Sequence, residues 1–144
     1  MLRKILLTDT QEWGTLPLRL VLGLVFMAHG SQKLFGWLGG GGLSATAAHF
    51  AAKLGFTPGV FWAGLAGAGE FFGGLLVILG LATRVGACFI AGVMVVAIVK
   101  VHRGAFFLPG GMEFALVLLG VAVALIIKGG GRFSLDGIIV KSLE

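Results

Sequence analysis

Ionisable side chains interrupt two long apolar stretches of this chain. Residues 16–35, LPLRLVLGLVFMAHGSQKLF, contain Arg19, His29 and Lys33, and residues 58–80 contain Glu70. A helix of about 20 apolar residues crosses the hydrocarbon core of a bilayer, and an ionisable group inside it is costly unless it faces protein or water. We therefore expect these four side chains to face the interior of a helical bundle.

The three basic residues of the first stretch share one side of the predicted helix. Arg19, Leu22, Phe26, His29 and Lys33 follow one another at intervals of three and four residues. This spacing repeats on one face of an α-helix, so the basic groups form a single stripe. The rest of the chain must supply partners for this stripe.

Three interpretations of these residues remain open. A rise of about 1.5 Å per residue places Glu70 between Arg19 and His29 in depth. Arg19 and Glu70 can form a buried ion pair that fixes helix register. Alternatively, His29 and Glu70, with Arg19 and Lys33 beside them, bind a polar head group such as a quinone carbonyl or hydroxyl, with Phe26, Phe71 and Phe72 covering its ring. In the third interpretation, His29 and Glu70 relay protons.

Other polar groups carry weaker signals. We expect Arg84 and Glu113 to take part in structural ion pairs, as Arg19 and Glu70 do. The single cysteine, Cys88, is interpreted as a small buried apolar residue, because the chain has no second cysteine with which to cycle a dithiol. No Glu-x-x-His pair is present, so we expect no metal site.

The composition is that of an integral membrane protein. Of 144 residues, 58% are hydrophobic and only 12% are charged, and the mean hydropathy is +1.05. Soluble domains are about one quarter charged. The net charge of +5 therefore indicates basic flanks at a membrane surface, and we expect a lipid bilayer rather than nucleic acid as partner.

The elements that must position these residues form one domain, residues 1–144. We expect an all-α membrane protein, a bundle of four transmembrane helices at about residues 15–35, 58–80, 84–101 and 112–128. A short interfacial helix at 45–54, capped by Ser44, is expected between the first two spans. Lysine and arginine number six on the side of the termini and four on the other side, which favours cytoplasmic termini. The six are Arg3, Lys4, Arg84, Lys128, Arg132 and Lys141.

Several short motifs, taken in order, resemble the bacterial DoxX family. They extend over about residues 13–140 and comprise Arg19, Gly23, Phe26, His29-Gly30 and Lys33; Glu70, Gly73-Gly74, Leu79-Gly80-Leu81 and Thr83-Arg84; Glu113; and Ser134-Leu135-Asp136. The resemblance implies a four-helix protein of the bacterial inner membrane. It is similar to the small, quinone-linked subunit of a thiosulfate:quinone oxidoreductase, and other members are linked with thiol redox homeostasis and resistance to oxidants.

The function expected from this resemblance is that of a redox-associated subunit that binds a quinone-like or other small amphipathic ligand. Its partner would be a redox protein or further copies of the chain, and a quinone is the cofactor implied. Whether the chain is itself catalytic is left open. The alternative is a non-catalytic membrane scaffold subunit or a small-molecule permease that acts as an oligomer.

Overall fold

All regular secondary structure in the described part of the chain is helical. The computed structural model describes residues 6, 8–107 and 109–142, so Arg3 and Lys4 lie outside it. Within these residues there are six α-helices and no strand. The α-helices are α2 (Thr15–Phe35), α3 (Gly42–Leu54), α4 (Gly59–Leu79), α5 (Thr83–Val96), α6 (Glu113–Lys128) and α7 (Leu135–Ser142). A 3₁₀ turn, Trp37–Gly39, follows α2, and a π-helical turn, Ala97–Val101, prolongs α5.

The long helices occupy the four ranges expected from the sequence. Two segments, Gly59–Leu79 and Thr83–Val101, are long and apolar enough to cross a membrane. Helix α2 and the 16-residue α6 do not meet that measure. The all-helical class is therefore confirmed, whereas the crossing of a membrane by all four helices stays a prediction.

Two details of the expected elements were wrong. Helix α3 begins at Gly42, three residues earlier than expected, and no side chain caps it, so Ser44 is not its cap. The tail, for which no helix was expected, forms α7, and the Oγ of Ser134 accepts a hydrogen bond from the Gly137 backbone at 3.0 Å. This is the N-cap pattern of a helix start.

Glycines allow α2 and α4 to lie unusually close together. A Cβ atom at Gly74 would come within 2.7 Å of the Gly23 carbonyl oxygen, and one at Gly30 would collide with the Phe71 backbone. Small residues at such positions let membrane helices approach at backbone distance. This packing fixes the register of the two helices, with residue 30 level with residue 71.

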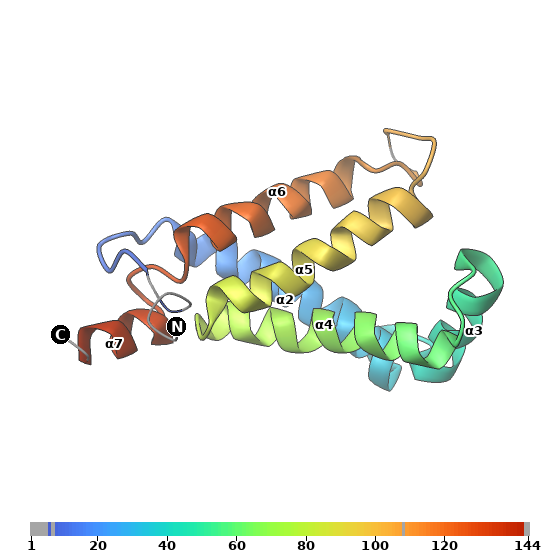
Figure 1. Cartoon of the computed structure of the whole chain (residues 1–144), viewed down its shortest axis with the longest axis horizontal. Coiled ribbons are helices and arrows are strands. Elements are labelled where there is room, and N and C mark those ends of the chain that lie inside the picture. Colours follow the sequence, from blue (N-terminus) through green and yellow to red (C-terminus); the bar gives the residue numbers. More distant parts are fainter. Residues whose placement is uncertain (1–5, 7, 108, 143–144) are drawn as a thin grey trace.

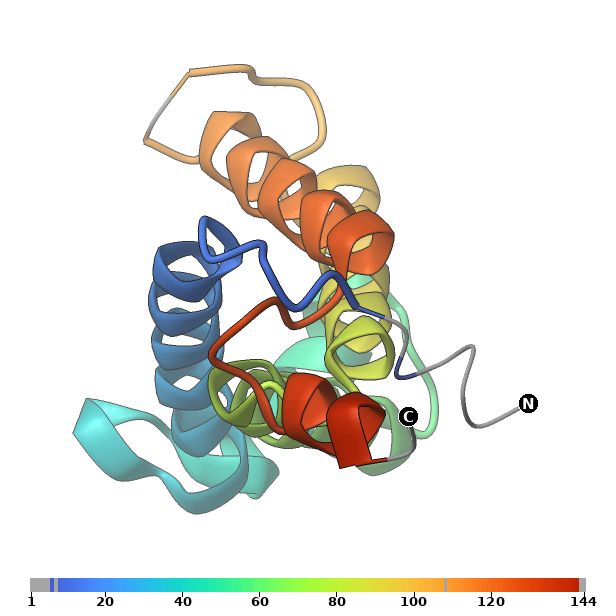
Figure 2. The same cartoon turned by 90° about the vertical axis from the view of Figure 1, so that its left-hand side faces the viewer.

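The four long helices are arranged as two pairs that diverge. The pair α2 and α4 lies beside the pair α5 and α6, and the pairs approach at the α7 end and separate towards α3 (Figure 1). Viewed from the α7 end, the four helices surround a common centre (Figure 2). Buried side chains fill that centre, among them Leu22, Phe26, Val77, Ile90 and Leu125, each at most 1% exposed.

Candidate functional site

A large cavity lies between the two helix pairs on the side of α3. Its volume is about 1070 Å³, slightly above the usual range of about 300–1,000 Å³ for sites that bind small molecules. Its walls come from stripes of α2, α3, α4, α5 and α6. The stripe of α4 comprises Trp62, Leu65, Ala66, Gly69 and Glu70. The stripe of α5 and the first residue of its π-helical turn includes Cys88, Phe89, Gly92, Val93, Val96 and Ala97. Both stripes follow the helical spacing that places residues on one face.

An ion pair between α2 and α4 lies in the wall of this cavity. The Nζ of Lys33 is 2.6 Å from Oε2 of Glu70, and the side chains are 25% and 3% exposed. A carboxylate removed from water must have a partner, and a lysine ammonium within hydrogen-bond distance supplies both charge and donor. The pair therefore allows an ionised carboxylate to remain in an apolar bundle.

His29 lies one helical turn from Lys33 on α2 and lines the same cavity. Its side chain is exposed, although its helix neighbour Phe26 is buried. A neutral imidazole offers one hydrogen-bond donor and one acceptor and can take up a proton near neutral pH. His29, Lys33 and Glu70, three of the four expected ligand-binding residues, thus come together.

The expected pairing of Arg19 with Glu70 was wrong. The guanidinium of Arg19 donates hydrogen bonds of 2.7–2.9 Å to four backbone carbonyls, those of Val77, Ile78, Gly130 and Phe133. Val77 lies seven residues beyond Glu70, about 10 Å along the helix. The depth estimate failed because it treated each helix separately, whereas glycine packing sets α2 level with α4 so that Lys33, not Arg19, reaches the carboxylate.

Arg19 instead joins three parts of the chain at the α7 end of the bundle. It is 2% exposed and bridges α2, the end of α4 and the segment before α7. In the same region Asp136 accepts hydrogen bonds from the Ala82 and Thr83 backbone N–H groups, at 2.7 and 2.9 Å, and from the Thr83 hydroxyl at 2.8 Å. A carboxylate at the first N–H groups of a helix satisfies donors that lack partners within the helix. Asp136 therefore caps α5 from α7, a contact that sequence reasoning missed.

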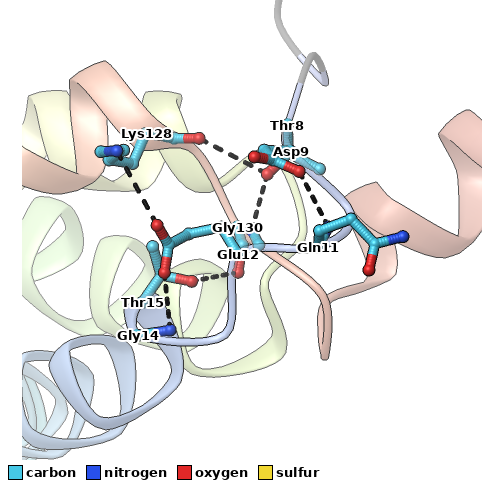
Figure 3. Close-up of polar contacts among 9 residues, drawn as sticks. Thr8, Asp9, Gln11, Glu12, Gly14, Thr15, Lys128 and Gly130 are labelled. Atoms are coloured by element: carbon cyan, nitrogen blue, oxygen red, sulfur yellow. Dashed lines mark hydrogen bonds and ion pairs between the residues drawn. The ribbon is translucent and has the colours of Figure 1, made fainter.

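Polar contacts also tie the N-terminal segment to this end of the molecule. Thr8 Oγ1 accepts a hydrogen bond from the Gly131 backbone at 2.6 Å, and Thr15 Oγ1 donates one to the Gly130 carbonyl at 2.9 Å (Figure 3). A more exposed ion pair joins Glu12 and Lys128 at 3.8 Å. The segments before α2 and after α6 thus close the bundle opposite to the cavity.

Arg84 and Glu113 do not lie together. Arg84 donates a hydrogen bond to the carbonyl of Ile126 at 2.5 Å, near the end of α6. Glu113 is the first residue of the same helix, about 20 Å from Ile126 at 1.5 Å per residue. The two residues therefore act at opposite ends of the bundle.

The aromatic and cysteine expectations were partly wrong. Phe26 lines the cavity, but Phe71 stacks edge-on against Phe35, and Phe72 is 54% exposed away from the cavity lining. Cys88 is exposed and lines the cavity instead of being buried.

Two further histidines contribute to the cavity lining. His49 of α3 and His102, after the π-helical turn, lie on its walls, and Nδ1 of His102 is 3.0 Å from the Gly110 carbonyl oxygen. The helical periodicity of α3 is the sequence signal that could have placed His49 in the cavity lining. In the part of the chain that the structure describes, no three His, Cys, Asp or Glu residues are grouped so as to hold a metal ion.

Comparison with known proteins identifies a family and a curated relative. The DoxX family model matches residues 14–103. A protein of Bacillus subtilis (strain 168), named "Putative oxidoreductase CatD", is 34% identical over 132 residues, which cover 90% of each chain. No solved structure gives a significant match. The matched range includes Arg19, His29, Lys33 and Glu70, so the cavity ion pair lies within it, whereas two of the carbonyls that Arg19 contacts, those of Gly130 and Phe133, lie beyond it.

Proposed function

Because this chain belongs to the DoxX family, we propose that it is a redox-associated membrane subunit whose cavity binds a quinone-like or other small amphipathic ligand. The observation that carries this proposal is the cavity itself. It has a volume of about 1070 Å³, and its mainly apolar and aromatic walls are interrupted by His29 and the Lys33–Glu70 pair. Apolar walls with a few converging polar groups are the usual composition of a small-molecule site.

The polar groups suit the head of a quinone or phenol. Lys33 and Glu70 neutralise one another, so the local charge does not select an ionic ligand. His29 can donate to a carbonyl oxygen or accept from a hydroxyl, and the carboxylate of Glu70 can accept from a hydroxyl. Phe26 and Phe89 supply ring contacts in the walls.

Proton chemistry is also available at this place. Reduction of a quinone to a quinol consumes two protons for two electrons. A protonated imidazole can deliver one, and the ionised carboxylate of Glu70 can take up a proton from water and pass it on. Neither side chain supplies electrons, so a redox partner protein must do so. The name of the B. subtilis relative mentions oxidoreductase activity, which is consistent with such an association.

The proposed setting is the bacterial inner membrane, crossed four times. The spans are α2, α4, α5 with its π-helical turn, and α6, with the N and C termini in the cytoplasm and α3 on the opposite side. The even number of long helices and the position of Thr8 beside the segment before α7 support termini on one side. Assembly with a redox partner or with further copies of the chain is part of the proposal.

Titration of a soluble quinone analogue against the purified protein tests the ligand site. We expect saturable binding to wild type that weakens by about tenfold or more in His29→Ala and Glu70→Gln, because each removes a hydrogen bond to a desolvated head group. Leu24→Ala and Glu12→Gln are matched controls, since Leu24 is 61% exposed on the outer face of α2 and Glu12 lies at the α7 end. Absence of saturable binding to folded wild type would exclude the quinone site and favour a scaffold function.

A further inference from the structure

We propose that the cavity is a one-sided access route, through which water, protons and small polar solutes reach His29 and Glu70 from the α3 side of the membrane only. This inference goes beyond the proposed ligand, since it depends on the depth, lining and closure of the cavity and not on what the cavity binds.

The cavity reaches far into the bundle. On α5 its lining extends from Cys88 to the neighbourhood of Val101, which is about 20 Å of helix at 1.5 Å per residue. A bilayer core is about 30 Å thick. On α4 the lining runs from Trp62, in the first turn, to Glu70 in the middle of the helix. The route therefore reaches the middle of α4, at the ion pair, and about two thirds of the core thickness along α5.

Polar groups occur at both ends of this route. Near α3 the lining includes His49, Gln32, Thr46, His102 and the glycine backbone of residues 39–41. At the inner end it includes His29 and the Lys33–Glu70 pair, and the Lys33 side chain remains 25% exposed. The walls are mainly apolar, but a roomy cavity holds water where polar groups line it, unlike a purely apolar one. Hydration of the cavity would connect the inner polar groups to the α3 side.

The opposite end of the bundle is closed. Beyond the cavity the side chains of Leu22, Val77 and Leu125 are at most 1% exposed and fill the centre. Farther on, Arg19 is bound to four carbonyls, and the segments at 8–15 and 129–134 cover this end. A packed core of this kind leaves no space for a charged solute. A charged solute therefore has no path to the cavity from the α7 end.

One position on α5 can obstruct the route without disturbing the core. A Cβ atom at Gly92 would meet nothing within 4 Å, and Gly92 lines the cavity one turn from Cys88 towards α3. A phenylalanine there would fill the open space. Gly120 of α6 is equally unobstructed but does not line the cavity, so Gly120→Phe is the matched control.

The experiment uses Cys88 as a reporter, since it is the only cysteine of the chain. Full-length protein is placed in sealed vesicles of uniform orientation, and a charged, membrane-impermeant maleimide is added from either side. Two reference variants on a Cys88→Ser background identify the sides, Ala48→Cys in α3 and Ser142→Cys at the end of α7. A charged reagent does not cross the lipid.

We expect Cys88 to react from the side that labels Ala48→Cys and not from the side that labels Ser142→Cys. Gly92→Phe should slow the reaction by about tenfold or more because it fills the route, and Gly120→Phe should leave the rate unchanged. Labelling by an uncharged, permeant maleimide only, or equal labelling from the α7 side, would overturn the proposal. The side from which Cys88 of wild type is labelled tests the proposal even if Gly92→Phe fails to fold. Failure of quinone binding would leave the labelling pattern unaffected, so the two proposals fail separately.

Discussion

The Lys33–Glu70 pair provides a quantitative test of how the bundle is held in register. Lys33→Met leaves the carboxylate of Glu70, which is 3% exposed, without its ammonium partner. Breaking a buried pair from one side costs about 3–5 kcal/mol. Because Lys33 is 25% exposed, water partly compensates, and we expect a loss of about 2–3 kcal/mol.

The other single substitution of this double-mutant cycle should cause a smaller loss of stability. Glu70→Gln keeps the shape of the side chain and removes its charge, and the freed Lys33 can extend towards the cavity, so we expect a loss of about 1 kcal/mol. In the double variant no buried charge is left without a partner. Its loss should be smaller than the sum of the single losses by about 1–2 kcal/mol.

Thermal unfolding in one detergent measures this cycle. A loss of 2–3 kcal/mol corresponds to a fall of about 10 °C in Tm for a chain of this size. The single variants, the double variant and wild type should be compared at equal detergent and protein concentrations. Additive losses within about 0.3 kcal/mol would refute the reasoning, because independent sites behave in that way.

Three further predictions concern the α7 end and the topology. Arg19→Lys should lower stability by about 3 kcal/mol, since an ammonium cannot replace a planar guanidinium that donates to four carbonyls. In thermal unfolding this loss should add to that of Glu70→Gln, and strong coupling between the two substitutions would contradict the structure. Asp136→Ala should cost about 1–2 kcal/mol through loss of the α5 cap, and amide hydrogen exchange at the start of α5 should rise; unchanged exchange there would contradict the capping role. Reporter fusions at Glu144 and within residues 39–42 should place the first in the cytoplasm and the second outside it; an active periplasmic reporter at Glu144 would reverse the topology.

The sequence predicted the helices well because their signals are local. Long apolar stretches bounded by glycine define α2 and α4, which end at Gly36 and Gly80 with φ values of 73° and 64°. Only glycine adopts such a conformation without strain. The short α7 was missed although Ser134 is a capping residue, because eight residues give too little periodicity to be recognised.

The partners of the charged residues could not be predicted in the same way. The choice between Arg19 and Lys33 as partner of Glu70 depends on how far α2 is displaced along α4, which Gly30 and Gly74 set through close backbone contact. The depth of a residue along its own helix gives no information on that displacement. The divergence of the two helix pairs is also a property of the assembled bundle, so the sequence identified His29 and Glu70 but not the cavity around them.

The central claim is that the cavity of this DoxX-family protein binds a quinone-like amphiphile. Mass spectrometry of the gently purified protein tests it most directly, with wild type and Glu70→Gln compared side by side. The account predicts a small amphipathic molecule retained by wild type in near-stoichiometric amount and depleted in the variant. Wild type that retains only bulk lipid, or retains a defined protein partner and no small molecule, would contradict it.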